Sequence, residues 1–188
     1  MKKNRFITGL CLICIGLSLY LNDLVGNRIK KNYEQKKLDN ALNEIVGYKY
    51  VDTSDKYMAV LSIPKIKLKR GIYELDDINN NVDSNIMIYK SSTLPDTYPS
   101  NVILMAHSGV GNTAYFNRLN ELDKDSIVEF YYNHTKYVYK IDNFYYVDKI
   151  GEVNLEYNKD KKTITLITCS ELDKQLVYIG YLIDEINY

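Results

Sequence analysis

The sequence predicts an all-β fold, a closed eight-stranded β-barrel with one or two short helices, preceded by an N-terminal membrane helix. After Tyr57, short apolar runs rich in Val, Ile, Thr and Tyr alternate with turn residues, which is typical of strands. Helical crossovers, which a doubly wound sheet needs, are absent from this pattern. Ahead of it, an uncharged apolar run extends from Phe6 to Asn22.

Composition limits the classes of function. The 188 residues contain 24 basic and 24 acidic side chains, so the balance of charge indicates no nucleic-acid partner. The chain has 19 Tyr, 4 Phe and no Trp. Tyrosine has an apolar ring and a polar tip, so it suits strands that are half buried.

The N-terminal run predicts a signal anchor that is not cleaved. Lys2, Lys3 and Arg5 precede it, and its length is near the lower end of the roughly 17–25 residues that span a bilayer. A cleaved signal peptide also has basic residues before an apolar core, but no A-x-A-like site follows here. We therefore expect residues 1–26 to form a cytoplasmic stub and a single membrane span. By the positive-inside rule, the rest of the chain is expected outside the cell.

Residues 27–56 are rich in Lys, Asn and Glu and are expected to form a stalk. Ile29, Tyr33, Leu38 and Leu42 recur at loosely helical spacing, which favours a helix. A flexible charged spacer explains the same composition, and both alternatives stay open. Either one would hold a domain of residues 57–188 away from the membrane.

The barrel is predicted from eight strands in this last domain. They are Tyr57–Ile63, Leu68–Ile72, Met87–Tyr89, Asn101–Ala106, Ser126–Tyr132, Lys136–Val147, Thr163–Thr168 and Gln175–Ile183. The segment from Tyr132 to Lys136 reads as a hairpin turn between two alternating runs. The spacing within Phe116–Leu122 predicts a short helix.

His107 is the first candidate for chemistry. It follows the apolar strand Asn101–Ala106 and precedes a glycine-containing loop, which places it at the surface end of a buried strand. Taken alone, the residue could equally be a histidine with backbone partners. The other histidine, His134, falls in the predicted hairpin turn and is interpreted as a solvated loop residue.

Cys169 is the second candidate. Cys11 and Cys14 lie in the apolar N-terminal run, so the predicted domain has a single cysteine, at the end of the strand Thr163–Thr168. A lone cysteine is often a buried core thiol. A thiol attacks efficiently as a thiolate, however, and an adjacent imidazolium favours that form. The placement of Cys169 and His107 at strand ends therefore indicates a nucleophile and its acid/base partner.

Metal and cofactor chemistry is not indicated. One Cys and one His on separate strands do not supply a zinc shell. Gly109 and Gly111 open no phosphate-binding motif. The acidic residues Glu74, Asp76 and Asp77 are interpreted as solvated loop charges. We expect no metal and no cofactor.

Together these segments resemble the sortases, cell-surface transpeptidases of Gram-positive-type bacteria. The resemblance extends over roughly Tyr57 to Ile183. Its most specific part is the sequence TLITC that ends at Cys169. It also includes IPKI from Ile63, the segment NVILMAHS with Ala106 where glycine is usual, and FNRLNEL from Phe116.

The resemblance implies an eight-stranded barrel and a two-step acyl transfer. Cys169 would cleave a Leu-Pro-x-Thr-Gly-like sorting motif of a secreted protein through a thioester, and His107 would protonate the departing amine. An amine of a peptidoglycan precursor or a pilin would then accept the acyl group, with hydrolysis as a side reaction. Substrate contacts are expected from Ala106, Ser108 and Thr168, which flank the catalytic pair.

The family's third catalytic residue, an arginine, is missing. The stretch after Cys169 contains no arginine, and Gln175 takes that place, next to Lys174. A glutamine amide can donate a hydrogen bond to an oxyanion, but it carries no charge. The domain's arginines are Arg70 and Arg118, which are distant from this strand in sequence.

Three functional alternatives follow. The first is an active transpeptidase that uses Gln175 or Lys174. The second is a catalytically weakened sortase fold that serves as a surface binding module, which the missing arginine alone supports. An unrelated secreted cysteine peptidase is the third. It would usually show a signal cleavage site and an Asn or Asp that orients the histidine.

Overall fold

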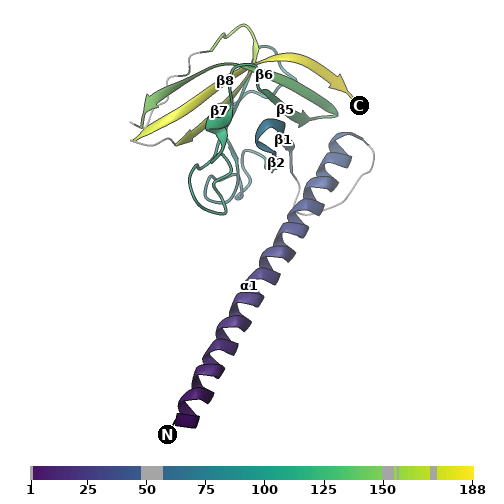
Figure 1. The fold of residues 1–188 in the computed structure, drawn as a ribbon. Helices are drawn as coiled ribbons and strands as arrows, with labels where there is room; N and C mark the ends of the chain where they lie inside the picture. Colours follow the sequence, from purple (N-terminus) through teal and green to yellow (C-terminus); the bar gives the residue numbers. More distant parts are fainter. Residues whose placement is uncertain (1, 48–56, 150–154, 156, 170–172) are drawn as a thin grey trace. The chain divides into compact units, whose positions relative to one another are not determined.

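The computed structural model describes residues 2–47, 57–149, 155, 157–169 and 173–188, with side chains of the first helix from residue 12 on (Figure 1). The chain divides into two compact units, Met1–Asp39 and Asn40–Tyr188. The predicted linker up to residue 56 and the loop Ser170–Lys174 lie partly outside the described residues. The predicted boundary between stalk and barrel therefore stays a prediction.

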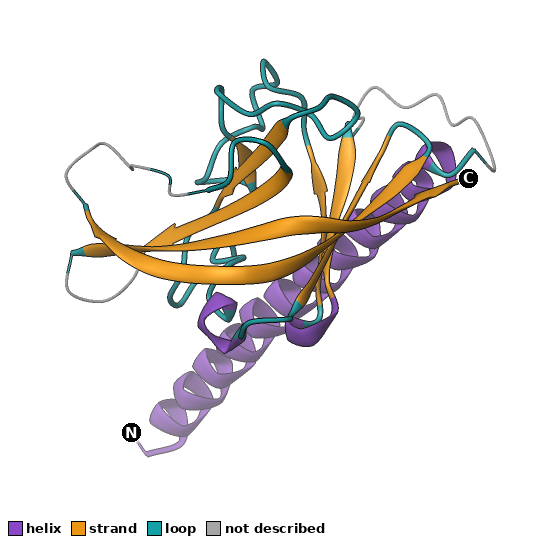
Figure 2. Ribbon diagram, turned by 90° about the horizontal axis from the view of Figure 1, so that it is seen from above, coloured by secondary structure: helices purple, strands orange, loops and turns teal. Residues whose placement is uncertain are grey.

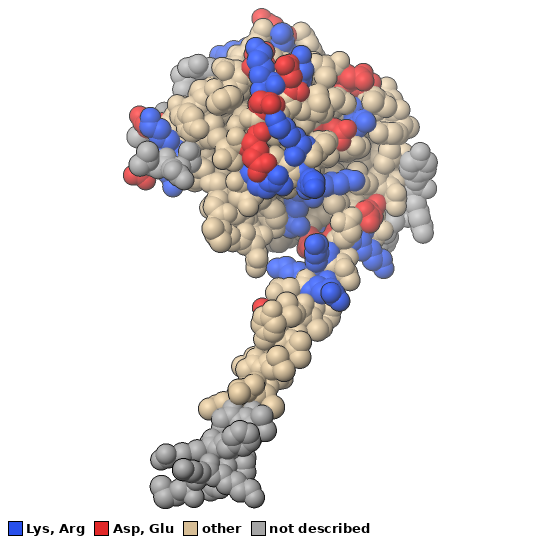
Figure 3. Space-filling view, in the orientation of Figure 1, with Lys and Arg blue, Asp and Glu red and all other residues tan. Residues whose placement is uncertain are grey.

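Helix α1 extends from Lys2 to Ile45, so the stalk segment is helical as far as that residue. From Leu12 to Asn22 the helix carries no charged side chain, and the charges begin at Asp23 (Figure 3). Within the part of the chain that the structure describes, no helix meets the length and apolarity of a membrane span. The anchor and the extracellular location stay predictions.

All eight predicted strands are present, with ends that differ from the predictions by a few residues. They are β1 (Ala59–Ile63), β2 (Leu68–Ile72), β3 (Met87–Ile88), β4 (Ser100–Met105), β5 (Ile127–Tyr132), β6 (Thr135–Asp148), β7 (Lys162–Cys169) and β8 (Lys174–Asn187). Two 3-10 helices, η1 (Pro64–Ile66) and η2 (Leu119–Glu121), accompany them. The second lies within the predicted helix Phe116–Leu122, which is therefore shorter than expected.

The strands form one curved sheet (Figure 2). Their order in it is β2-β1-β5-β6-β8-β7-β4-β3. The prediction of a closed barrel is wrong in one respect, because β2 and β3 end this order and no pairing joins them among the described residues. The barrel is nearly closed. The reason is local: β3 has two residues, and the chain before it is folded into turns rather than into a strand.

The sheet is also mixed, because β4 and β7 run parallel whereas the other pairs are antiparallel. The connection between these two parallel strands passes through β5 and β6, and its described residues contain no α-helix. The prediction that the sheet is not doubly wound is confirmed.

The predicted hairpin joins β5 to β6. Tyr132 pairs with Thr135, which leaves Asn133 and His134 as the two turn residues. Both have positive φ angles, 46° and 58°, as a type I′ turn requires. His134 is therefore a turn residue, as the sequence indicated.

Side chains alternate across β4, β7 and β8, which gives the sheet an inner and an outer face. On the inner face Leu104, Leu166 and Tyr178 belong to the main core cluster. On the outer face a second cluster contains Ile103, Ile167, Val177 and Ile179. The strands are thus apolar on both faces, which explains why β7 reads as a continuous apolar and Thr-rich run.

The close approach of Gly71 to the Tyr57 ring yields a stability prediction. A Cβ atom at Gly71 would lie 2.1 to 2.3 Å from three carbons of that ring. Tyr57 is 2% exposed and packs edge-on against the ring of Tyr73 at 4.8 Å, so it cannot move aside easily. We expect Gly71→Ala to lower the free energy of unfolding by about 1–3 kcal/mol in chemical denaturation.

Gly111→Ala is the matched control, because a Cβ at that position meets nothing within 4 Å. An unchanged midpoint for Gly71→Ala would contradict the packing described for Tyr57.

Candidate functional site

The parallel pairing of β4 with β7 brings the two candidate residues together. Its register ends with Met105 opposite Ile167, and His107 and Cys169 each follow two residues later. Neighbouring strands lie about 4.8 Å apart, and the C-terminal ends of parallel strands meet at the same edge. His107 and Cys169, which are 62 positions apart in the sequence, therefore leave the sheet side by side.

Three hydrogen bonds continue this register beyond the last strand pair. The amide of Ala106 donates to the carbonyl of Ile167 at 3.3 Å. The hydroxyl of Thr168 donates to the carbonyl of Ala106 at 2.9 Å. The hydroxyl of Ser108 donates to the carbonyl of Cys169. These contacts hold the backbone on both sides of the histidine to the backbone around the cysteine.

Alternation then determines which way the two side chains point. Residues 103 and 105 share one face of β4, His107 continues the same alternation two residues beyond its end, and residues 165, 167 and 169 share the same face of β7. Because Ile103 and Ile167 lie in the outer cluster, His107 and Cys169 belong to the outer face. The thiol of Cys169 is free and partly exposed, and His107 is 42% exposed. Both can be reached by a substrate.

Gln175 lies next to this pair, so that His107, Cys169 and Gln175 form a row on the outer face of the sheet. It is the residue of β8 directly opposite Cys169, and it lies on the same face as Val177 and Ile179 of the outer cluster. Lys174 lies on the other face, and its ammonium is 3.9 Å from the carboxylate of Asp148. The register therefore brings Gln175, and not Lys174, beside the cysteine.

The three predicted substrate-binding residues differ in position. Ala106 and Thr168 are 5% and 4% exposed, and both point toward the inner face of the sheet. Their side chains are thus turned away from the thiol, and only their backbone reaches the outer row. Ser108 is half-buried and bonded to the cysteine carbonyl, so it fixes the position of Cys169.

The loop after His107 leaves the strand sharply. Gly109 has a φ angle of 101°, a conformation that L side chains rarely adopt, so glycine is required there. The chain returns at Phe116, whose amide donates to the carbonyl of His107 at 3.0 Å and whose side chain is 1% exposed. This buried phenylalanine anchors the far end of the loop.

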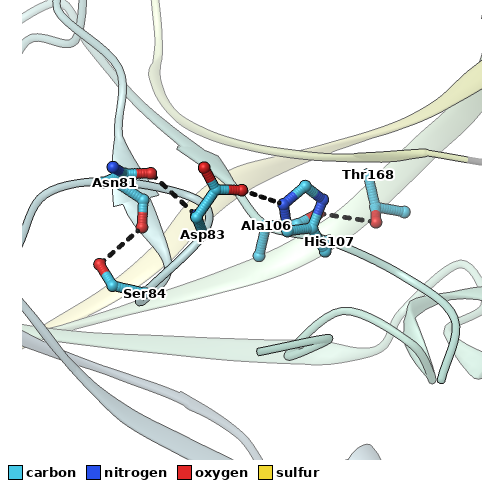
Figure 4. Close-up of polar contacts among 6 residues, drawn as sticks. All are labelled: Asn81, Asp83, Ser84, Ala106, His107 and Thr168. Carbon is cyan, nitrogen blue, oxygen red and sulfur yellow. Dashed lines mark hydrogen bonds and ion pairs between the residues drawn. The ribbon is translucent and has the colours of Figure 1, made fainter. Parts of the chain in front are cut away.

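The structure adds one residue that the sequence interpretation missed. Asp83 lies beside His107, with its Oδ1 atom 2.9 Å from Nε2 of the ring (Figure 4). The antiparallel pairing of β3 with β4 explains this contact. Met87 of β3 is opposite Met105 of β4, so the residues just before β3 lie next to those just after β4. Recognising this required the register of a two-residue strand, which periodicity does not provide.

The other candidates lie in different contexts. The guanidinium of Arg118 is paired with Glu121 at 2.7 Å. Arg70 donates to Asn85 at 2.8 Å and stacks on the ring of Tyr115 at 4.5 Å. No group of three or more metal-ligating side chains was found among the described residues.

Comparison with known proteins agrees with this geometry. A family model, the sortase domain, matches residues 61–181. Sortase A of Listeria monocytogenes aligns with a TM-score of 0.60 and 19% identity, over 71% of this chain and 92% of that chain. Sortase C-3 of Streptococcus pneumoniae aligns with a TM-score of 0.62 and 16% identity, over 84% and 86% of the two chains.

A third structure is sortase C of Clostridium perfringens with the C-terminal cell wall sorting motif. It aligns with a TM-score of 0.60 and 20% identity, over 79% of this chain and 86% of that one. No curated protein sequence matches the chain. At these identities the structural matches show the shared fold.

The row across β7 and β8 yields a cross-linking prediction. Directly opposed residues of an antiparallel pair have Cβ atoms roughly 4.5–5.5 Å apart, close to the separation that a disulfide needs. We expect Gln175→Cys to form a disulfide with Cys169 under mild oxidation, detected by peptide mass spectrometry.

Lys174→Cys is the matched control, because its side chain lies on the opposite face of the same strand. A disulfide between Cys169 and residue 174, with none to residue 175, would show that the register is shifted by one residue.

Proposed function

The chain belongs to the sortase family, and from this premise we propose that it is a cell-surface cysteine transpeptidase with Cys169 as its nucleophile. The observation that carries the proposal is the row of His107, Cys169 and Gln175 on the outer face of three neighbouring strands. A nucleophile, an acid/base group and a hydrogen-bond donor at adjacent positions are the parts that acyl transfer from a peptide needs.

In the first step the Cys169 thiolate attacks the carbonyl carbon of the scissile peptide bond. A C–S bond forms and the C–N bond breaks as His107, in its imidazolium form, gives a proton to the departing amine. The product is a thioester on Cys169. Two easier steps thereby replace one difficult transfer.

In the second step an acceptor amine attacks the thioester. His107, now neutral, takes the proton from that amine, and the thiolate of Cys169 leaves. Water in place of the amine gives hydrolysis as the side reaction. The enzyme returns to its starting protonation state in either case.

The proposed donor is a secreted protein with a C-terminal sorting motif of the Leu-Pro-x-Thr-Gly kind. Two observations support this. The Clostridium perfringens relative was solved with the C-terminal cell wall sorting motif. In addition, partly buried Met105, Tyr145 and Val147 pack around the outer apolar cluster, which offers apolar surface to an extended peptide beside Cys169.

The proposed acceptor is an amine of a peptidoglycan precursor or of a pilin. Such partners are found outside the cell, which agrees with the proposed single-pass anchor in residues 1–26 and a catalytic domain on the extracellular side. The basic residues at the N-terminus support this orientation.

Gln175 is proposed to take the position of the family's arginine. Its amide can donate a hydrogen bond to the oxyanion that develops on the attacked carbonyl. Because it is neutral, it does not help to hold the thiolate. The second candidate function, a sortase-fold binding module with weakened catalysis, is favoured by this same missing charge.

The acyl intermediate separates these two functions. We expect the full chain, incubated with a panel of sorting-motif peptides, to gain the mass of the peptide acyl group on Cys169. Hydroxylamine should release that mass, because it cleaves thioesters, and Cys169→Ala should never acquire it. A chain that remains folded and never carries an adduct would support the binding module.

The role of Gln175 is tested by two substitutions. We expect Gln175→Ala to lower the rate of peptide cleavage by about 100-fold, the typical effect of losing one oxyanion donor. Gln175→Arg should raise the rate, since it adds a charge beside the thiolate. Lys174→Ala, on the opposite face, should leave the rate unchanged. Equal rates for both Gln175 variants and the unchanged chain would rule out Gln175 as the arginine's substitute.

A further inference from the structure

The turn that carries Asp83 is closed by its own polar groups. The amide of Asp83 donates to Oδ1 of Asn81 at 2.8 Å. The carbonyl of Asn81 accepts from the amides of Ser84 and Asn85, at 3.1 and 2.8 Å. Although Asp83 itself is 80% exposed, its backbone is therefore held in one conformation (Figure 4).

Two asparagines attach this turn to the barrel. Asn80 bonds to the backbone of Ile88 in β3 twice, accepting from its amide at 2.8 Å and donating to its carbonyl at 3.1 Å. Asn85 is 1% exposed and donates to the carbonyl of Gly71 in β2 at 2.8 Å. The turn is thus bonded to β2 and β3, the two edge strands of the sheet.

A third attachment joins the turn to the loop that follows His107. The guanidinium of Arg70 donates to Oδ1 of Asn85 and lies 4.5 Å from the centre of the Tyr115 ring. The hydroxyl of Tyr115 is 3.4 Å from the carbonyl of Ser84. Tyr115 directly precedes Phe116, whose amide is bonded to the carbonyl of His107. Asp83 and His107 are therefore positioned by the same connected set of contacts.

The contact between Asp83 and His107 selects a tautomer. An ionised carboxylate only accepts hydrogen bonds, so the Nε2 atom that faces it must carry the proton. Nδ1 is then the ring nitrogen that exchanges a proton with other groups. Figure 4 shows Nδ1 on the side of the ring turned away from Asp83.

We propose that Asp83 is the positioning residue of this active site, which holds the imidazole of His107 through Nε2 in one orientation and one tautomer. The inference rests on the proposed transpeptidase function and deepens it. An arginine beside the cysteine would stabilise a thiolate directly, whereas Gln175 is neutral. Here the thiolate is stabilised by the imidazolium, and the imidazolium by the carboxylate of Asp83.

An ordinary surface ion pair is the competing explanation. Exposed pairs usually add little to stability, and both partners here reach solvent. What distinguishes this pair is the bonded turn beneath the carboxylate, which leaves only the side-chain torsions of Asp83 to be ordered. The two explanations differ in what they predict: an ion pair changes stability slightly, whereas a positioning residue changes the chemistry of Cys169.

The first test compares Asp83→Asn, Asp83→Ala and Asp83→Glu in the full chain. We expect the first two to lower kcat for peptide cleavage about tenfold, less than the 10²–10⁴-fold that complete general acid–base catalysis supplies. KM and the melting temperature should be unchanged. Asp83→Glu should recover part of the loss. Asp76→Asn is the matched control, since it removes the same charge from an exposed position of the same connection.

The second test needs no peptide substrate. The rate of Cys169 alkylation by iodoacetamide at neutral pH reports the thiolate, and peptide mass spectrometry separates Cys169 from Cys11 and Cys14. We expect Asp83→Asn to slow this reaction several-fold. In ¹⁵N NMR spectra, neutral His107 should carry its proton on Nε2 in the unchanged chain and become a mixture of tautomers in Asp83→Asn.

The third test uses position 175, where this chain has a neutral glutamine. In a Gln175→Arg background the arginine also stabilises the thiolate. Asp83→Asn should therefore lower kcat and the alkylation rate less in that background than in the unchanged chain. An equal loss in both backgrounds would contradict the shared electrostatic role.

Other outcomes would overturn the proposal as a whole. One is that Asp83→Asn leaves kcat, the alkylation rate and the tautomer of His107 unchanged. Another is that Asp76→Asn lowers kcat as much as Asp83→Asn does. A third is that kcat falls in parallel with the melting temperature and Asp83→Glu does not restore it. A chain that alkylates normally and cleaves no peptide would count against the proposed function alone, while the alkylation and NMR measurements still decide the role of Asp83.

Discussion

The parallel pairing of β4 with β7 is the constraint on which the rest of the site depends. Two strands that run in the same direction end at the same edge of the sheet. In this register Met105 pairs with Ile167, so the positions of His107 and Cys169 lie at the same level. Without it, His107 and Cys169 would be two unrelated residues 62 positions apart. The bonds from Ala106, Thr168 and Ser108 extend the pairing beyond the strands, so the backbone around the two candidate residues is held to the sheet.

Neighbouring pairings then add the remaining parts from both sides. On one side β8 runs antiparallel to β7 and brings Gln175 opposite Cys169. On the other side β3 runs antiparallel to β4 and brings the Asp83 turn beside His107. Gln175 is therefore positioned by backbone pairing, and Asp83 by a turn that the short side chains of Asn80 and Asn85 bond to the neighbouring strands. A site built in this way is well suited to chemistry that requires close alignment of reacting atoms.

In our proposal, a sortase site without the family's arginine stabilises its thiolate by a different arrangement of charges. Where the family has an arginine next to the cysteine, this chain has a neutral amide, and its neighbouring lysine points to the other face beside Asp148. The carboxylate of Asp83 lies on the far side of the histidine instead. In our proposal, the stabilising charge has moved from the strand after the nucleophile to the connection between β2 and β3.

The sequence by itself determined the eight strands, the hairpin at Asn133 and His134, the family and the candidate pair of Cys169 and His107, because alternation, turn residues and the TLITC segment are local signals. Only the tertiary structure decided that the barrel is nearly closed, that β4 and β7 are parallel, and that the side chains of Ala106 and Thr168 face inward. It also separated Gln175 from Lys174 and brought Asp83 to the histidine. These features depend on the register between strands that are distant in sequence. A shift of one residue would turn every side chain to the other face, and a strand that is apolar on both faces, such as β7, does not specify that choice by its own pattern.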